Sequence, residues 1–428
     1  MSELALLGGE SAVTLQRPLW PQLGAPEVAA LNAAVEASRS DVNFLNSMPG
    51  EGPVASFEAH LRAYYGLGYA VATNSCAAAL QMALYAAGVS AGDEVVVSPY
   101  TWGQTVSPIL HQLGVPIFAD IDPTSYCMRP DAVEAAIGER TKAILVVHIY
   151  GHPADMDPIL EVARRYGLPV IEDCAQAMGA RYKDRKVGTL GDLACFSFGD
   201  GKQIVGGDGG CVLTDDQRYR DRLVEIGSHP LRQQRDIEGP DAAAYIDSLT
   251  YTYRMHPLAA VLVDKQLDFL ETWHAERRAN HQRLSSGLSD IPGVAPVTEA
   301  TDVEHCFHKY CPSFLPHEAH GVSRERYVDA VAAEGVPLTL GYVRTPIPLR
   351  PRFQDRRYFF GNGLPWSLHP DASSLYQAGD YPIAEKRCAE TELEIMFAPA
   401  LRGDQSELVD QYLDAFQKVA EHLDTLAG

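Results

Sequence analysis

The strongest constraint on this fold is the alternation of short apolar stretches with helical stretches between residues 69 and 214. The apolar stretches are rich in valine and isoleucine, as in "YAVAT" (69–73), "DEVVVSP" (93–99) and "TKAILVVHIYG" (141–151). Strands that read as continuous apolar runs are usually covered on both faces. Segments with helical spacing, such as "CAAALQMALYAAG" (76–88), separate them. The alternation predicts βαβ units and an α/β fold with a mostly parallel central sheet between helices.

The pattern changes after residue 255, where the alternation stops. Residues 256–288 form one long helical stretch, and residues 341–381 are rich in proline, arginine and aromatic residues without periodicity. A long aperiodic stretch is typical of a loop over a site or an interface. We therefore predict two domains. Residues 1–255 form an N-terminal arm and a large ligand-binding domain, and residues 256–428 form a smaller α+β domain with a long interface helix and a substrate loop.

The composition of the chain limits its partners. It has 35 lysine and arginine residues against 56 aspartate and glutamate residues, a formal net charge of −21. Nucleic acids and anionic membranes require a basic surface, so we expect neither as a partner. The sequence has no apolar run of membrane-spanning length and no signal peptide, which predicts a cytoplasmic protein. The 8 cysteines include no C-x-x-C pair, and we predict no metal site.

Two charged residues stand where a ligand of such a sheet would bind. Asp173 ends the expected strand "VIEDCA", and Lys202 lies in the glycine-rich run "FSFGDGKQIVGGDGG" (196–210). Ligands of open α/β sheets bind at the carboxyl ends of the strands. Taken alone, Asp173 reads as a helix cap and Lys202 as a solvated loop charge. Together they suit pyridoxal phosphate, which needs a lysine for its Schiff base and a carboxylate to keep its ring nitrogen protonated.

A phosphate site and a flat binding surface accompany this pair. Ser75 and Cys76 lie where a strand turns into a helix, and the N–H groups of a helix N-terminus favour an anion. Ser197 offers another hydroxyl, and Trp102 offers an indole that can stack on a pyridine ring. Each residue has a structural alternative, since Ser75 suits a plain N-cap and Trp102 a core position. The joint pattern on successive strand ends favours the cofactor.

With these residues in place, the chain resembles the DegT/StrS-type sugar and cyclitol aminotransferases, which are pyridoxal phosphate enzymes of fold type I. Residues 170–210 carry the most specific part of the resemblance, and the matches cover nearly the whole chain. The matching segments occur in the family order: "GPVASFEAHLRAYYG", "SCAAALQMAL", "GVSAGDEVVVSPYTW", "GVPIFADIDP", "VVHIYGHPADMDPI", "VIEDCAQAMGARYKDRKVGTLGDLACFSF", "GDGG", "YTYRMHPLAAVLV" and "EGVPLTLGY".

The resemblance implies a role for each predicted site residue. Lys202 is the catalytic Schiff-base lysine, Asp173 pairs with the pyridinium nitrogen, and Gln176 lies near the phenolic oxygen. The phosphate is held by Ser197 and the backbone at Ser75 and Cys76, and Trp102 stacks on the ring. The family fold is a homodimer with shared active sites, so Thr252 in "YTYR" (251–254) is expected to reach the neighbour's phosphate.

Three positions depart from the family pattern. Cys76-Ala77 stands where the family usually has Gly-Thr, which removes a hydroxyl contact to the phosphate. Thr252 stands where the family has asparagine. Asp200, two residues before the lysine, is expected to raise the pKa of Lys202 if it lies close. A related branch has histidine at the lysine position and performs dehydration, and Lys202 argues against that branch.

The predicted reaction moves an amino group from glutamine or glutamate to a keto-sugar or a keto-cyclitol in secondary-metabolite biosynthesis. The N-terminal "LALLGGESAVTLQRPLWPQLG" is similar to the branch acting on inososes, and the aminohydroxybenzoate branch begins similarly. Asn43, Phe44, His308 and Tyr342 are the candidate substrate contacts, although a lone His308 is more often structural. The arginines from 344 to 357 are expected to be solvated.

Two alternatives to transamination stay open at this point. The first is another reaction of the same cofactor, namely elimination, decarboxylation, replacement or the synthesis of an aminohydroxybenzoate. The second is a non-catalytic regulatory protein that binds pyridoxal phosphate.

Overall fold

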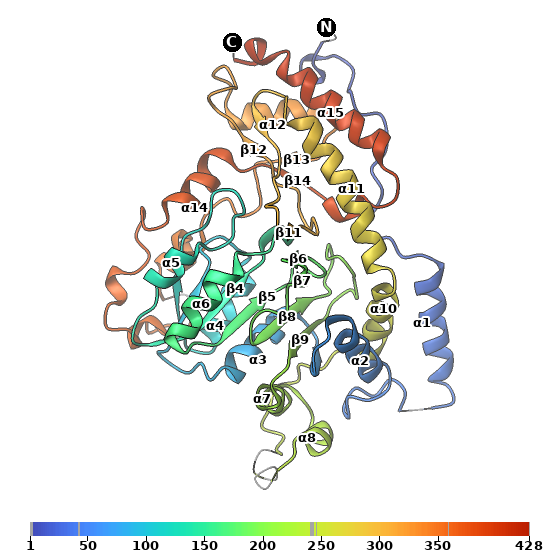
Figure 1. Ribbon diagram of the computed structural model, residues 1–428, viewed down its shortest axis with the longest axis vertical. Coiled ribbons are helices and arrows are strands. Elements are labelled where there is room, and N and C mark those ends of the chain that lie inside the picture. The colour runs from blue at the N-terminus through green and yellow to red at the C-terminus, as the bar shows by residue number, and fades with distance from the viewer. Residues whose placement is uncertain (1–2, 42, 240–243, 245, 358, 428) are drawn as a thin grey trace.

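The computed structural model describes residues 3–41, 43–239, 244, 246–357 and 359–427, and a seven-stranded sheet forms its centre. Neighbouring strands are parallel except at β9, which runs antiparallel to both β1 and β8. The predicted α/β fold with a mostly parallel sheet is therefore confirmed (Figure 1). In sheet order the strands are β1 (Tyr69–Thr73), β9 (Gly210–Thr214), β8 (Leu193–Ser197), β5 (Val170–Asp173), β4 (Thr141–Val147), β2 (Glu94–Val97) and β3 (Val115–Phe118).

Helices between the strands pack on this sheet, and local sequence explains their boundaries. The helix α3 (Cys76–Ala86) begins where the Ser75 hydroxyl accepts a hydrogen bond from Ala78, as an N-cap does. The helix α6 (Met156–Tyr166) ends at Gly167, which has a left-handed φ of 65° that suits glycine. The other helices of this region are α2 (Pro53–Tyr65), α4 (Gly103–His111), α5 (Pro130–Ala135), α7 (Gln217–Gly227) and α8 (Pro230–Asp236).

The C-terminal region adds helices and small sheets around a second apolar cluster. The long helical stretch expected at 256–288 is two helices, α10 (Pro257–Leu267) and α11 (Leu270–Leu288), which meet at Asp268 and Phe269. The other helices here are α12 (Arg324–Ala333), α15 (Ser406–Ala420) and α16 (Leu423–Ala427). The short strands pair as β10 (Val294–Ala295) with β12 (Ser313–Phe314), β11 (Val303–Glu304) with β6 (Arg181–Tyr182), β6 with β7 (Arg185–Lys186), and β13 (Leu338–Thr339) with β14 (Glu394–Ile395).

The aperiodic segment returns from the C-terminal region to one edge of the large sheet. The Tyr376 hydroxyl donates to the carbonyl of Pro116 in β3 at 2.8 Å, and His369 contacts Glu94 in β2 at 2.9 Å. The segment therefore covers the β2–β3 edge. Its short helices are η3 (Ile347–Leu349), α13 (Pro351–Gln354), η4 (Trp366–Leu368) and η5 (Ala372–Ser374). After it come α14 (Pro382–Lys386), η6 (Arg387–Thr391) and, beyond β14, η7 (Ala398–Ala400).

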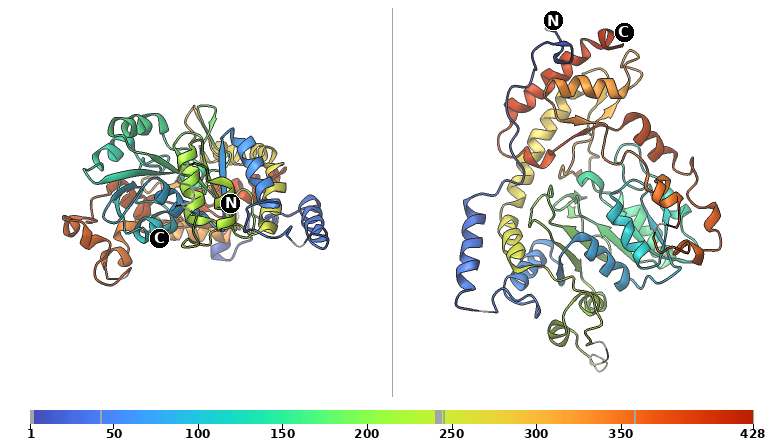
Figure 2. Two further views of the ribbon diagram at one scale, coloured as in Figure 1. Left: turned by 90° about the horizontal axis from the view of Figure 1, so that it is seen from below. Right: turned by 180° about the vertical axis from the view of Figure 1, so that it is seen from behind.

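The N-terminal segment packs mainly against the C-terminal region. Leu4 is fully buried in the second apolar cluster, just before η1 (Ala5–Leu7), and the amide of Ala5 donates to Glu334 at 2.8 Å. The amide of Thr14 donates to Gln411 in α15 at 2.8 Å. The helix α1 (Ala25–Ala37) then lies beside α10 at the side of the body (Figure 2). Both ends of the chain consequently lie at the same end of the molecule (Figure 1).

Helix length and hydropathy bear on the membrane prediction. Among the residues that the structure describes, no helix combines the length and the apolar character needed to cross a membrane. The division of the chain at residues 255 and 256 stays a prediction.

Candidate active site

A cavity of about 490 Å³ opens at the carboxyl ends of the parallel strands, beside the C-terminal region. It gathers residues from distant parts of the sequence, and most of the predicted site residues line it. They are Ser75, Cys76, Trp102, Asp173, Gln176, Ser197, Lys202, His308 and Tyr342. Their convergence on one cavity makes it the candidate active site.

Asp173 ends β5 and presents a buried carboxylate to this cavity. Its Oδ2 accepts a hydrogen bond from the Thr105 hydroxyl at 2.8 Å, and its Oδ1 accepts one from the amide of Ala175 at 3.0 Å. The residue therefore caps a turn, and the alternative of a helix cap is wrong. Burial raises the pKa of Asp173, against the opposing effects of these two donors and of Lys202.

Lys202 lies on a tight turn of the glycine-rich run, and its amide donates to the carbonyl of Gly199 at 3.3 Å. Gly201 in this turn has a φ of 79°, which glycine adopts without strain. Burial lowers the pKa of Lys202, while the neighbouring carboxylate of Asp173 opposes that effect. The expected rise caused by Asp200 is wrong, because Asp200 is exposed and burial decides the direction.

The N-terminus of α3 forms one end of the cavity. The first turn of a helix carries backbone N–H groups without partners within the helix, and they attract anions. A Cβ on Gly210 would lie within 2.7 Å of the backbone of Ser75 and Cys76, so only glycine lets β9 pack this closely. Burial raises the pKa of the Cys76 thiol well above its usual value, so the thiol stays neutral and adds no charge against an anion.

Aromatic and amide groups line other parts of the cavity. Trp102 and Tyr342 stack with ring centroids 5.7 Å apart, and Trp102 is 51% exposed, so its alternative as a core residue is wrong. The Oε1 of Gln176 accepts the amide of Tyr150 at 2.7 Å, which leaves its side-chain NH₂ available as a donor. His308 is buried, which lowers its pKa well below the usual value, and its Nδ1 has no hydrogen-bond partner among the described residues.

Three predicted residues do not line this cavity. Asn43 and Thr252 are exposed and Phe44 is half-buried, all outside the lining. Residues 251–254 lie beside the end of β1, where the carbonyl of Tyr253 accepts the amide of Asn74 at 2.7 Å. The roles given to Asn43, Phe44 and Thr252 stay predictions. None of the arginines from 344 to 357 lines the cavity.

The structure adds residues to the site that the sequence did not indicate: Trp20, Gln104, Thr105, Lys309, Glu394, Met396 and Phe397. Thr105 lies shortly after the strand-end segment "SPYTWG", and Lys309 is adjacent to His308. Both residues could therefore have been predicted as site residues from the sequence. Glu394 lies at the start of β14, and no motif marks it.

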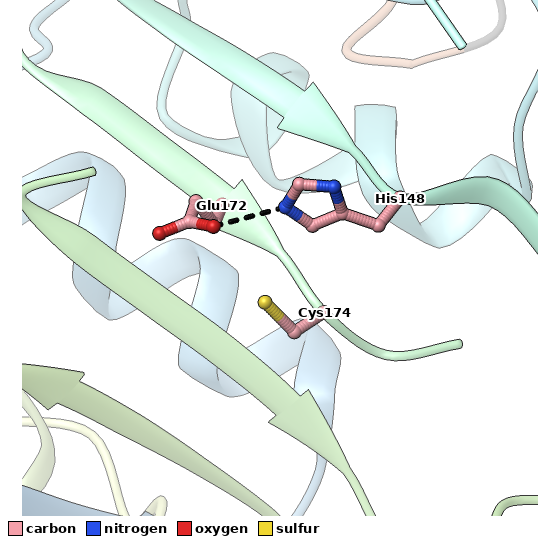
Figure 3. A group of neighbouring side chains, drawn as sticks. All are labelled: His148, Glu172 and Cys174. Carbon is pink, nitrogen blue, oxygen red and sulfur yellow. Dashed lines mark hydrogen bonds and ion pairs between the residues drawn. The ribbon is translucent and has the colours of Figure 1, made fainter. Parts of the chain in front are cut away.

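A buried cluster beneath the site has the residue types of a metal site but the bonding of a structural network. His148, Glu172 and Cys174 bring their side chains together (Figure 3). The Nδ1 of His148 accepts the amide of Ala154 at 3.0 Å, so its Nε2 donates to Glu172 at 3.0 Å. Both imidazole nitrogens are thereby used. Burial also keeps the thiol of Cys174 protonated by raising its pKa well above the usual value.

Glu172 completes that network. Besides His148 it accepts backbone amides from Gly188 at 2.8 Å, Leu190 at 2.8 Å and Gly191 at 2.7 Å. Burial alone would raise the pKa of Glu172, but these donors hold it below its usual value. The carboxylate therefore fixes the loop after β5 and offers little to a metal ion.

Comparison with solved structures defines the class of this fold. The X-ray structure of an aminotransferase from Psychrobacter cryohalolentis superposes with a TM-score of 0.79 at 26% identity, covering 96% of this chain and 100% of that one. The crystal structure of a 3-amino-5-hydroxybenzoic acid synthase gives a TM-score of 0.77 at 25% identity, covering 95% and 99%. The fold is thus that of the fold-type-I aminotransferases.

Sequence comparison then gives the family. The profile of the DegT/DnrJ/EryC1/StrS aminotransferase family matches residues 36–368. An L-glutamine:2-deoxy-scyllo-inosose aminotransferase from Streptomyces fradiae is 32% identical over 437 residues, covering 99% of this chain and 98% of that protein. The chain belongs to the DegT/DnrJ/EryC1/StrS aminotransferase family, as the sequence motifs predicted, and it is an aminotransferase.

Proposed function

We propose that this aminotransferase binds pyridoxal phosphate and moves the amino group of L-glutamine to a keto-cyclitol of the inosose type, in aminocyclitol antibiotic biosynthesis. The observation that carries the proposal is that Lys202 and Asp173 line one cavity with the N-terminus of α3. The similarity to the Streptomyces fradiae enzyme, over nearly the full length of both chains, supports the donor and the acceptor.

The residues of the cavity fit the cofactor. Lys202 would attach it, Asp173 would face its ring nitrogen, and the Gln176 amide would donate to its phenolic oxygen. The N-terminus of α3, with Ser75, Cys76 and the hydroxyl of Ser197, would hold the phosphate. When bound, the cofactor supplies a protonated ring that accepts electrons during the reaction.

The residues of the cavity then have defined roles in the proposed reaction. The Nζ of Lys202 would take a proton from the substrate carbon and return it, and burial lowers its pKa, which favours the neutral amine. Thr105 and the amide of Ala175 orient the carboxylate of Asp173. The stacked rings of Trp102 and Tyr342 give the cavity an aromatic wall.

The proposal includes a homodimer with shared active sites, working in the cytoplasm. The exposed positions of Asn43 and Thr252 support this, since neither residue lines the cavity of its own chain. The test mixes Lys202→Ala subunits with Thr252→Val subunits. Shared sites predict that the mixture recovers activity above the average of the two variants, and an exact average would contradict sharing.

The first test of the function is the absorbance spectrum of the purified protein with pyridoxal phosphate, before and after excess L-glutamine. Glutamine is expected to convert the bound cofactor to its amine form, and 2-deoxy-scyllo-inosose is expected to reverse the change. Borohydride reduction and peptide mapping should place the cofactor on Lys202, with Lys202→Ala as the control. Product formation without consumption of glutamine would instead support elimination, decarboxylation or replacement, and binding without turnover would support a regulatory protein.

A further inference from the structure

Two charged residues in the cavity wall have no place in the proposed cofactor site. Lys309 and Glu394 both line the cavity, and their ammonium and carboxylate groups form an ion pair. The side chain of Glu394 is buried, with 6% of its surface exposed, and that of Lys309 is 19% exposed. Ring nitrogen, phenolic oxygen and phosphate are already matched by other residues, so this pair is available to a substrate.

Backbone hydrogen bonds fix the pair before any ligand arrives. The amide of Lys309 donates to the carbonyl of Tyr150 at 3.2 Å. On the other side, the amide of Ile395 donates to the carbonyl of Tyr310 at 2.9 Å, and Glu394 pairs with Thr339 between β14 and β13. The two charges therefore come from adjacent, rigid segments, and little side-chain freedom would be lost when a ligand binds.

The pair keeps hydrogen-bonding capacity after its mutual contact. An ammonium has three N–H donors, and a carboxylate has two oxygens, of which the contact uses Oε1. A second donor and a second acceptor thus lie side by side at the cavity wall. The Nζ of Lys309 also lies 4.7 Å from the centroid of the Tyr342 ring, which adds an apolar surface next to the charges.

We propose that Lys309 and Glu394 recognise two neighbouring hydroxyl groups of the amino acceptor. One hydroxyl accepts from Lys309, the other donates to Glu394, and the Tyr342 ring packs against the C–H face of the same ring. This inference rests on the proposed function and names the part of the site that selects a polyhydroxylated ketone. L-glutamine has no two neighbouring hydroxyl groups to match this donor and acceptor, so the pair distinguishes the amino acceptor from the amino donor.

The test measures the two half-reactions separately in Lys309→Met and Glu394→Gln. The acceptor half-reaction with 2-deoxy-scyllo-inosose is expected to lose roughly 10- to 100-fold in kcat/KM, mainly through KM, because a hydrogen bond to a charged group is lost. The donor half-reaction with L-glutamine is expected to stay within about threefold of wild type. Lys183→Met is the matched control, since Lys183 pairs with Asp157 in an exposed salt bridge at 2.6 Å.

A second readout does not depend on turnover. Calorimetric titration with myo-inositol, an unreactive cyclitol, should detect binding to wild type and to Lys183→Met but weaker binding to the two cavity variants. Equal losses in both half-reactions would overturn the inference and leave the pair a structural contact. Wild-type protein that binds no cyclitol would overturn it as well. If myo-inositol binds through the pair while no inosose is aminated, the proposed acceptor is wrong and the hydroxyl recognition stands.

Discussion

Two adjacent carboxylates on β5 are both buried, yet their surroundings differ. Glu172 accepts hydrogen bonds from His148 and from three backbone amides, and its pKa is held below the usual value. The carboxylate of Asp173 accepts only from Thr105 and Ala175 among the described residues, and its pKa is raised by burial. Strand geometry sends successive side chains to opposite faces, so one carboxylate points into the protein and the other into the cavity.

This difference indicates which of the two buried carboxylates is available to a ligand. The donors around Glu172 compensate the loss of water, so this carboxylate stabilises the fold and has little left to offer a ligand. Asp173 has fewer donors and lies in one cavity with Lys202. The ring nitrogen of the proposed cofactor would supply a cationic partner for Asp173, and its small number of donors marks this carboxylate as a functional candidate.

The largest expected effect comes from Asp173→Asn, which tests the carboxylate that faces the cavity. We expect aminotransferase kcat to fall by roughly 10²- to 10⁴-fold, the range for a positioned acid or base, because the ring nitrogen loses its anionic partner. The melting temperature of the cofactor-free protein should stay the same or rise, since a poorly compensated buried charge is removed. Steady-state kinetics and calorimetry check both parts, and a large drop in melting temperature would contradict the assignment.

Glu172→Gln addresses the other carboxylate and should have the opposite profile. The free energy of unfolding is expected to fall by about 2–3 kcal/mol, because hydrogen bonds to a charged acceptor are lost and an amide NH₂ meets backbone donors. Activity per folded molecule should stay within a fewfold of wild type. Denaturant titration and active-site titration measure the two quantities. A loss of activity without a loss of stability would contradict the structural role assigned to Glu172.

The contributions of Asp173 and Glu172 to the pH dependence of stability should also have opposite signs. The raised pKa of Asp173 contributes stability to the cofactor-free protein at low pH, and this contribution is lost as pH rises through the raised value. The lowered pKa of Glu172 contributes stability above the ordinary carboxyl pKa, and it is lost as pH falls through the lowered value. The measurement is a set of melting curves from about pH 2 to about pH 8. Relative to wild type, Asp173→Asn should lose less stability as the pH is raised, and Glu172→Gln should lose less stability as the pH is lowered. Parallel curves for the two variants would contradict this.

The smallest expected effect comes from Thr105→Val, which removes one of the two donors to Asp173. The loss of one neutral hydrogen bond predicts about a fivefold lower kcat and little change in the KM for glutamine. Thr105→Ser, which keeps the hydroxyl, is the matched control and should restore most of the rate. A serine variant as slow as the valine variant would mean that packing, and not the hydrogen bond, positions Asp173.

The sequence predicted the sheet and the centre of the site because both depend on local patterns. Apolar strand runs and strand-end positions are enough to bring Asp173 and Lys202 to one edge of a parallel sheet. The ion pair of Lys309 and Glu394 escaped prediction because its members are 85 positions apart and join only through tertiary packing. The direction of the Lys202 pKa was also missed, since sequence proximity to Asp200 says nothing about burial.

The N-terminal segment has a consequence for the order in which the molecule can be completed. Its residues up to Trp20, which lines the cavity, are synthesised before the C-terminal residues that they contact. Leu4 packs among C-terminal residues and Thr14 bonds to Gln411. A chain that lacks α15 therefore loses part of the surface on which this segment packs, and with it the support of the cavity wall that contains Trp20.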